Sequence, residues 1–301
     1  MIHGVINVYK EKGYTSHDVV AKLRGILKQK KIGHTGTLDP DAEGVLPVCL
    51  GKATKLCDLL ADEKKTYRAV LLLGTATDTQ DISGKILEQK EVLVSEEETK
   101  CAIRSFEGQY NQIPPMYSAL KVNGKKLYEL AREGKEVERK PRPVTIFSII
   151  IESVELPRVI MTVECSKGTY IRTLCHDIGI KLGCGGCMEQ LKRTRVGTFF
   201  EEKSFKLFEI KKKEEEGKIA DIVTAVDRLF EELRKVTIMQ VHQKLLENGN
   251  PFVLGYQKEN DEFQDQEQVR VYDEKGIFYG LYRFEQKRNG FWPIKIFFEG
   301  R

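Results

Sequence analysis

A glycine-rich segment near the N-terminus constrains this chain more than any other feature. Residues 33–44 read GHTGTLDPDAEG, with three glycines and one proline in twelve residues. This density of glycine and proline predicts a structured loop rather than a regular helix or strand. Asp39 precedes Pro40, and a residue before proline is pushed away from helical geometry. The segment therefore predicts a carboxylate held in a restricted, outward-facing conformation.

The chemistry of this loop has several interpretations on its residues alone. No Gly-Lys-Ser/Thr follows the glycines at the spacing of a phosphate-binding loop. His34 is a single imidazole among carboxylates and lacks zinc-ligand spacing. Carboxylate catalysis stays open, with Asp39 as nucleophile or general acid–base. A plain turn, in which Asp39 bonds its own backbone, stays open as well.

Length and composition indicate an ordinary globular protein. The 301 residues suggest two domains, and 41% are hydrophobic and 31% charged. No apolar run approaches the roughly 18 residues that span a bilayer, and the N-terminus lacks the pattern of a signal peptide. We therefore expect a cytoplasmic protein with no membrane contact. Seven cysteines at irregular spacing do not indicate a disulfide framework.

The order of patterns predicts a mixed α/β domain followed by a small β-rich one. Strands are expected at residues 4–10, 66–74, 145–154 and 159–165, and helices after an N-cap at Ser16, over 52–60, from the Ser95/Glu98 capping box to Phe106, and over 170–182 up to Gly183. After about residue 236 come a short helix at 242–248 and strands near 269–272, 280–284 and 292–298. We expect domains at residues 1–235 and 236–301.

Six segments in register resemble motifs of one family. Residues 33–47 resemble the signature loop of the bacterial TruB family, the tRNA pseudouridine-55 synthases. Further segments that resemble family motifs, in the same order, are residues 4–16, 65–68, 112–121, 168–174 and 191–197. The resemblance covers about residues 2–200. Glu11 departs from it, because the family pattern has a proline after Lys10.

The resemblance implies a fold and an activity. The fold is the α/β (α+β) pseudouridine-synthase fold, with a mostly antiparallel central sheet and the site in a cleft across it. The C-terminal segment resembles a PUA-type RNA-binding domain at residues 276–280 and at Trp292-Pro293. The implied reaction turns uridine 55 in the tRNA T loop into pseudouridine after flipping the base, and it requires no cofactor and no metal.

The resemblance also implies catalytic roles for single residues. Asp39 matches the nucleophile, and Arg172 matches the arginine whose permanent charge favours the ionised carboxylate. Tyr67 matches the tyrosine that stacks on the target uracil and whose hydroxyl could help to move a proton. The structural alternatives are a helix-surface arginine and a core strand tyrosine.

Three further residues match substrate-binding positions. Leu191 matches an apolar residue that closes the pocket on the other face of the base, or it is plain core. His34 matches the histidine that fills the place of the flipped base, or it orders the loop. Lys10 matches a strand lysine near the active site, where packing or a phosphate contact is expected.

Basic segments and cysteines have two interpretations each. Beside the family motifs, the basic residues predict RNA phosphate contacts rather than a solvated face. They are Lys121, Lys125, Lys126, Arg132, Lys135, Arg139, Lys140 and Arg142, with Lys192, Arg193 and Arg195 as a second patch. Cys175-His176 and the Cys184–Cys187 pair have ligand types that suit zinc, but the first two fall inside an expected helix, so we expect buried apolar cysteines.

Two rival functions compete with stand-alone catalysis. One is a tRNA-folding chaperone that needs no chemistry, and the other is a guide-RNA-dependent synthase that needs partner subunits. A pure binder gains nothing from a carboxylate facing phosphates, so Asp39 with Arg172 favours an enzyme. The chain carries no obvious docking extension. We therefore expect a monomer that acts on the tRNA T stem-loop without an obligatory protein partner.

Overall fold

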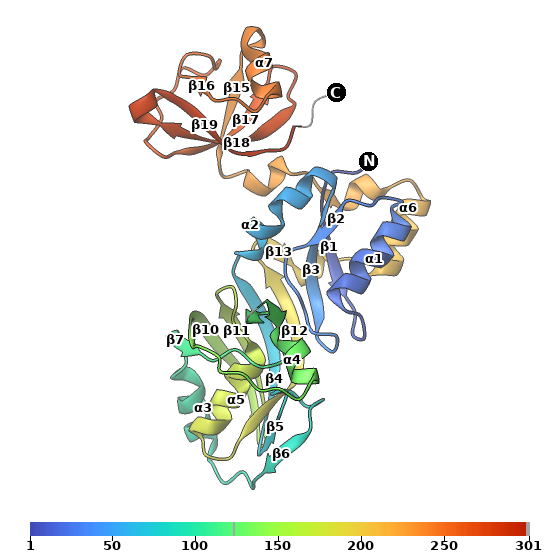
Figure 1. Cartoon of the computed structure of the whole chain (residues 1–301), viewed down its shortest axis with the longest axis vertical. Helices are drawn as coiled ribbons and strands as arrows, with labels where there is room; N and C mark the ends of the chain where they lie inside the picture. Colours follow the sequence, from blue (N-terminus) through green and yellow to red (C-terminus); the bar gives the residue numbers. More distant parts are fainter. Residues whose placement is uncertain (123, 299–301) are drawn as a thin grey trace.

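A ten-stranded sheet forms the backbone of the larger part of the molecule (Figure 1). The computed structural model describes residues 1–122 and 124–298. The main path of the sheet runs β14-β1-β3-β12-β4-β11-β10-β7, with β2 added at β3 and β13 at β12. The strands are β1 (Gly4–Lys10), β2 (Ile32–His34), β3 (Glu43–Leu50), β4 (Lys65–Leu73), β7 (Gly108–Gln112), β10 (Arg142–Glu155), β11 (Arg158–Cys165), β12 (Gly186–Val196), β13 (Phe199–Phe200) and β14 (Val223–Thr224).

The sheet is mostly antiparallel, as expected. Among the strands described for this sheet, β12 and β3 pair in parallel, at Lys192 and Arg193. This pairing joins the sheet segment β14-β1-β3 to the segment β4-β11-β10-β7, and so brings the N-terminal strands beside the second half of the domain. The glycine-rich segment is not a loop throughout, because His34 ends β2 and Glu43 begins β3. Only residues 35–42 lie between these two strands.

Helices cover the sheet in two groups (Figure 1). They are α1 (Ser16–Ile26), η1 (Gly51–Leu56), α2 (Cys57–Ala61), α3 (Glu96–Arg104), α4 (Leu127–Arg132), α5 (Ile171–Lys181) and α6 (Leu207–Glu215), with short 3-10 turns at Glu201–Lys203, Ile219–Ile222 and Asp227–Phe230. Two hairpins, β5 (Thr75–Thr77) with β6 (Ile86–Gln89) and β8 (Lys121–Val122) with β9 (Lys125–Lys126), stand outside the sheet. Among the described helices, none is long and apolar enough to cross a membrane.

Local capping follows the sequence signals with one correction. The Ser95/Glu98 capping box is confirmed, and α5 ends just before Gly183, which has a positive φ of 76°. The expected N-cap at Ser16 is wrong. Thr15 caps α1 and accepts the N–H of Asp18 at 3.0 Å, because the hydroxyl of Ser16 is instead used by the Leu38 N–H at 2.9 Å. The expected helix over 52–60 divides into η1 and α2.

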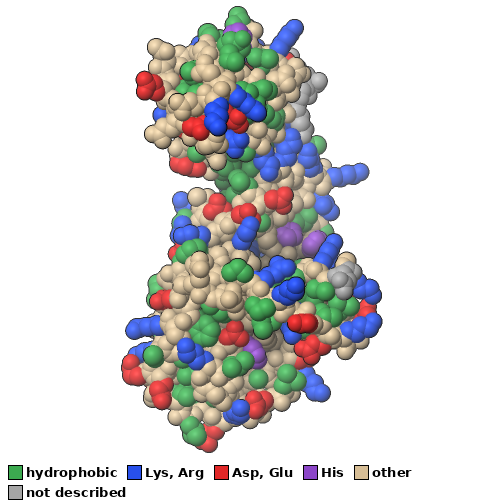
Figure 2. All heavy atoms as spheres, turned by 60° about the vertical axis from the view of Figure 1, so that its left-hand side comes forward, with side chains coloured by type: hydrophobic (Ala, Val, Ile, Leu, Met, Phe, Trp, Pro, Cys, Tyr) green, Lys and Arg blue, Asp and Glu red, His purple; other side chains and the backbone are tan. Residues whose placement is uncertain are grey.

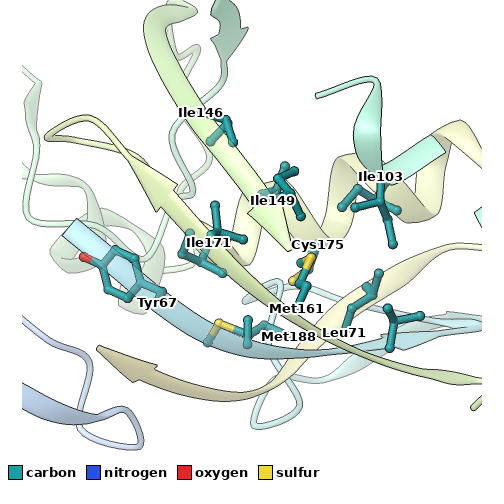
Figure 3. Close-up of a cluster of buried hydrophobic side chains, with 14 of the residues drawn as sticks. Tyr67, Leu71, Ile103, Ile146, Ile149, Met161, Ile171, Cys175 and Met188 are labelled. Carbon is teal, nitrogen blue, oxygen red and sulfur yellow. The ribbon is translucent and has the colours of Figure 1, made fainter. Parts of the chain in front are cut away.

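Two apolar clusters hold the helices to the sheet. One lies under α3 and α5 and is built from β4, β10, β11 and β12, with Leu71, Met161 and Leu174 fully buried (Figure 3). The other joins α1 and α6 to β1 and β3 around Ile6, Leu23 and Leu46. Residues 35–42 lie at the boundary between the two clusters. Leu38 and Ala42 belong to the first cluster, whereas Leu46 of the following strand β3 belongs to the second.

The C-terminal part is a separate five-stranded sheet, which confirms the expected β-rich unit. Its order is β15-β17-β18-β19-β16, and its elements are β15 (Arg234–Ile238), β16 (Phe252–Val253), β17 (Gln268–Asp273), β18 (Phe278–Glu285), β19 (Gly290–Ile296) and α7 (Gln243–Glu247), with 3-10 turns at Gln240–His242 and Gln286–Arg288. Leu281 and Phe297 of this unit pack with Leu56 and Phe199 of the larger one in a shared apolar seam. The sheet begins at Arg234, close to the boundary expected between 235 and 236.

Candidate active site

The Asp39 turn is tied to the turn that follows β1. The N–H of Gly13 donates to the carbonyl of Pro40 at 2.9 Å, and the N–H of Ala42 donates to the carbonyl of Asp39 at 3.1 Å. The Ser16 hydroxyl accepts the N–H of Leu38. Backbone groups on both sides of Asp39 are therefore satisfied within the protein, and its carboxylate is left to face outward with 39% of its side chain exposed.

Lys10 links the two turns through its side chain. Its Nζ donates to the carbonyls of Tyr14 at 2.6 Å, Pro40 at 3.1 Å and Glu11 at 3.3 Å. The side chain is fully buried, and burial lowers the pKa of Lys10 to about 8. Of the two roles expected for Lys10, the structure supports packing, because all three ammonium hydrogens have protein acceptors and none is left for a phosphate.

Arg172 lies in the first turn of α5 and faces Asp39. Its Nε is 3.0 Å from Oδ2 of Asp39, and its Nη2 donates to Oδ1 at 3.3 Å. The guanidinium also donates to the carbonyls of Tyr117 at 2.8 Å and Thr79 at 3.2 Å, and only 5% of the residue is exposed. This bidentate contact fixes the plane of the carboxylate and favours its charged form.

The start of α5 is itself held from the sheet edge. The Gln112 side chain donates to the carbonyl of Tyr170 at 2.9 Å and accepts the Tyr170 N–H at 2.8 Å. Gln112 ends β7, so this pair of bonds couples the outer strand to the residue that precedes the helix. The expected helix-surface alternative for Arg172 is therefore not what the structure shows, since the side chain points into the site and is buried.

Opposing effects set the charge of Asp39. Burial raises the pKa of the Asp39 carboxyl, and Arg172 opposes that rise, while Asp81 adds to it. Asp81 stands 3.7 Å from Nη1 of Arg172, so two carboxylates share one guanidinium. The pKa of Asp39 is raised overall, so the arginine offsets only part of the cost of ionising this carboxylate.

Tyr67 and Leu191 share one face of the sheet beside Asp39. Tyr67 pairs with Arg193, and Leu191 pairs with Ala69, so these four side chains point to the same side of β4 and β12. Tyr67 lies at one end of the apolar cluster, with its hydroxyl directed away from the labelled apolar side chains (Figure 3). Burial raises the pKa of Tyr67, so the hydroxyl is a neutral group in the free protein.

His34 sits at the end of β2 and packs against a second histidine. Its ring meets that of His17 edge to face, with centroids 5.2 Å apart. The Gly36 N–H donates to Nδ1 of His34 at 3.3 Å. Burial and the neighbouring His17 and Arg193 lower the pKa of His34 to about 4. The imidazole is therefore neutral near pH 7 and keeps a flat, uncharged ring at the mouth of the loop.

The two expected basic patches differ in the structure. The first patch is exposed at Lys121, Lys125, Arg132, Lys140 and Arg142. On the face drawn in Figure 2, Lys and Arg side chains gather near the middle of the molecule, close to histidines. The second patch is exposed only in part, at Arg195. Arg193 is 1% exposed, and Lys192 is paired with Glu201 at 3.0 Å. The surface position expected for Arg193 is wrong because successive strand residues point to opposite faces, so the Arg193 side chain turns into the protein while that of Lys192 turns outward.

Several contributors to the site carried no signal that the sequence analysis used. Asp81 and the carbonyl of Thr79 come from the turn between β5 and β6, and His17 comes from α1. The segment Asp78-Thr79-Gln80-Asp81 has the composition of a turn, but nothing in its spacing links it to Arg172. Within residues 1–122 and 124–298, no group of three or more His, Cys, Asp or Glu side chains is arranged to hold a metal ion.

Two family models match adjacent parts of this chain. The model for the TruB family pseudouridylate synthase N-terminal domain matches residues 24–171, and the model for the tRNA pseudouridylate synthase B C-terminal domain matches residues 172–231. The "tRNA pseudouridine synthase B" of Lachnoclostridium phytofermentans is 52% identical over 98% of this chain and 100% of its own length. That of Alkaliphilus oremlandii is 45% identical over 99% of both chains.

Solved structures share the fold over the full length. A chain in the structure of an H/ACA RNP bound to a substrate RNA containing 2'-deoxyuridine superposes with a TM-score of 0.73 at 26% identity, covering 99% of this chain and 86% of that one. A chain of a Cbf5-Nop10-Gar1 complex gives a TM-score of 0.73 at 28% identity, covering 98% and 85%. Both matches extend over the C-terminal unit, since they cover 99% and 98% of this chain.

Proposed function

The chain belongs to the TruB family of pseudouridylate synthases, and from this membership we propose that it converts uridine 55 of the tRNA T loop to pseudouridine with Asp39 as nucleophile. Its relatives carry the name tRNA pseudouridine synthase B, which supports tRNA as the substrate. The observation that carries the choice of nucleophile is the contact between Asp39 and Arg172 at 3.0 Å, in which a half-exposed carboxylate is held in a fixed plane.

The reaction makes three demands on these residues. The uridine has to leave its stack, at a cost of a few kcal/mol, before any side chain can reach it. The bond between ribose C1′ and base N1 then breaks, the base turns, and a bond forms between C1′ and C5. N1 gains a proton and C5 loses one, so the reaction is a balanced isomerisation with no redox change.

Asp39 suits the nucleophilic step because a carboxylate can bond covalently and leave again. It attacks only when ionised. Arg172 favours that form in a setting where burial disfavours it, so the arginine keeps the carboxylate reactive without removing its tendency to form a bond. The Tyr67 ring supplies a flat surface for the uracil, and Leu191 on the same sheet face supplies an apolar contact.

His34 suits the place vacated by the flipped base. A neutral ring stacks between bases at low desolvation cost, whereas a charged imidazolium would have to be dehydrated. The contacts to His17 and Gly36 hold the ring before RNA arrives. Filling the gap with a preset ring recovers part of the stacking that flipping removes.

The remaining parts of the proposal concern binding. We assign the exposed basic segment at residues 121–142 to phosphates of the T stem-loop, and residues 236–301 to a PUA-like domain that extends the RNA contacts of the catalytic domain at 1–235. The protein acts as a cytoplasmic monomer without a cofactor or an obligatory protein partner. The structural neighbours come from an H/ACA RNP and from a Cbf5-Nop10-Gar1 complex, so dependence on partners is the alternative to test.

The test is the pseudouridine content of an unmodified tRNA transcript after incubation with wild type, Asp39→Ala and Asp41→Ala. Carbodiimide labelling with primer extension maps the position. We expect modification at the T-loop uridine by wild type and by Asp41→Ala, which alters an exposed acid of the same loop, and none by Asp39→Ala. Filter binding should show that Asp39→Ala still binds the tRNA.

Each other outcome favours a named alternative. Wild type that binds and refolds tRNA without forming pseudouridine supports the chaperone function. Activity that appears only when guide RNA and partner subunits are added supports a guide-dependent synthase. Residual activity of Asp39→Ala comparable to wild type removes Asp39 as the nucleophile while leaving the family assignment intact.

A further inference from the structure

Arg193 is a buried cation that the proposed reaction has not used. Only 1% of the residue is exposed, and among the described residues its guanidinium has no carboxylate partner. Its Nε donates to the carbonyl of Val45 at 2.7 Å, and its Nη2 donates to the carbonyl of Gly36 at 3.3 Å. Burying an arginine without a counter-ion costs free energy. We therefore expect the contacts of this guanidinium to have a role in the protein.

Three segments of the site meet at this guanidinium. Val45 belongs to β3, Gly36 belongs to the loop that carries Asp39, and Tyr67 is the cross-strand partner of Arg193 on β4. Tyr67 and Arg193 are directly opposite each other on neighbouring strands and point to the same face, so the guanidinium lies close to the Tyr67 ring and opposes the rise that burial causes in the Tyr67 pKa. Five donors in one plane allow a single arginine to serve two carbonyls and a phenol together.

The backbones of Gly44 and Arg193 are packed so closely that residue 44 has no room for a side chain. Gly44 has a φ of 108°, and a Cβ there would lie 2.2 Å from the Arg193 carbonyl oxygen. This is the site where β12 pairs in parallel with β3. The main chain of Arg193 therefore touches the end of the loop while its side chain reaches back to Gly36 near the start, so the loop is clasped at both ends.

We propose that Arg193 is a positioning residue for the isomerisation, which holds the ring and hydroxyl of Tyr67 at a fixed place relative to the loop that carries Asp39. The inference rests on the proposed function. Arg193 makes no contact with RNA and takes part in no step of bond making. Its guanidinium acts through Tyr67, so its removal should matter only while Tyr67 has a hydroxyl to orient.

A double-mutant cycle tests this dependence. Single-turnover rates are measured on a tRNA transcript for wild type, Arg193→Lys, Tyr67→Phe and the double variant. Lysine keeps the charge and loses the planar fork. We expect Arg193→Lys to lower the rate at least about tenfold with the Kd for tRNA within about twofold, and to lower it less than about threefold in the Tyr67→Phe background. Equal factors in both backgrounds, or a loss confined to Kd, would overturn the proposal.

A second readout does not need activity. Tyrosine is labelled with carbon-13 at Cζ, and the Tyr67 resonance is identified by its absence from Tyr67→Phe. Arg193→Lys should shift this resonance. Arg68→Lys is the matched control, because Arg68 lies next to Tyr67 on β4, points to the opposite face and pairs with Glu152 at 2.7 Å. An unshifted Tyr67 resonance in Arg193→Lys would contradict the proposal.

The two readouts separate the proposal from the function on which it rests. If wild type forms no pseudouridine, the proposed function fails, and the resonance of Tyr67 still decides whether Arg193 orients this tyrosine. If wild type is active and the resonance is unmoved by Arg193→Lys, the function stands and the positioning role fails. Thermal unfolding of each variant confirms that the folded protein is compared.

Discussion

Arg172 and Asp39 are 133 positions apart in the chain, yet Nε of one lies 3.0 Å from Oδ2 of the other. The arginine comes from the first turn of α5 and the aspartate from the turn between β2 and β3. Neither end of the contact is free to move, because Arg172 is held by two backbone carbonyls and the Asp39 turn is held through Lys10. The pair is therefore preorganised before RNA binds.

Replacing Arg172 should change both the rate and its dependence on pH. In Arg172→Met the cation that opposes protonation of Asp39 is gone, so the pKa of Asp39 should rise further. Because only the ionised carboxylate attacks, activity is lost as pH falls through this pKa. We expect the acid limb of the single-turnover rate to move to higher pH, and the rate at pH 7 to fall by about 10²–10³.

Arg172→Lys distinguishes charge from geometry in the same experiment. Lysine keeps a cation but cannot form the two-pronged contact, so the acid limb should stay closer to that of wild type while the rate at its plateau still falls. An acid limb that does not move in Arg172→Met would show that another group controls the low-pH side.

Lys10 should make stability depend on pH in the alkaline range. Its pKa is lowered to about 8 in the folded protein from an ordinary 10.5, so between these values the unfolded chain binds more protons. This contribution to stability is present in full above pH 10.5 and is lost as pH falls to about 8. We expect the difference in unfolding free energy between wild type and Lys10→Met to grow with pH in this window, by about 3 kcal/mol at most.

The measurement is urea denaturation of both proteins at pH values from 7 to 10. Lys65 has a pKa lowered to about 8 by burial and is present in both, so its effect cancels in the difference. A difference that shrinks as pH rises would show that the buried Lys10 stays fully protonated in the folded protein.

His34 should contribute its ring rather than its charge. Because the pKa of His34 is lowered to about 4, no change in tRNA affinity from this residue is expected between pH 6 and 8. His34→Phe should keep most of the affinity. His34→Ala should weaken it by a stacking contact of about 1–3 kcal/mol, which is about 5- to 150-fold. Equal losses in the two variants would favour the loop-ordering role.

The exposed basic segment should set the salt dependence of tRNA binding. Lys140 and Arg142 are exposed, whereas Lys135 is paired with Glu133 at 2.8 Å. We expect Lys140→Ala and Arg142→Ala each to reduce the slope of log K against log salt by about 0.7–0.9, and Lys135→Ala to reduce it less. Slopes that match wild type for all three would place the phosphate contacts elsewhere.

The apolar seam between the two parts should contribute to global stability. Leu281 is 3% exposed and packs with residues of the larger unit. Leu281→Ala should lower the free energy of unfolding by about 2–5 kcal/mol. Val253→Ala, at an exposed position of the same unit, should change it little. A separate early transition in the thermal melt of Leu281→Ala would show that the seam joins two units that fold independently.

The sequence by itself determined the local features whose causes are local. The capping box at Ser95 and Glu98, the stop of α5 before Gly183 and the buried strand β4 follow from neighbouring residues, so they were predictable. Asp39, Tyr67 and Arg172 were predicted together from the family resemblance and not from their spacing, and the structure brings Asp39 and Arg172 into contact. The β-rich C-terminal unit followed from its short strands and turns.

Only the tertiary structure decided which long-range contacts these residues make. The hydroxyl of Ser16 serves Leu38, 22 positions away, which is why the N-cap moved to Thr15. Arg193 is buried, because β12 lies between β3 and β4 in the sheet and the side chain of Arg193 points inward. Asp81 lies beside Arg172 because of the turn between β5 and β6, and that turn has no sequence motif. Hydrogen bonds and burial between segments far apart in sequence depend on strand order and register, which local patterns do not encode.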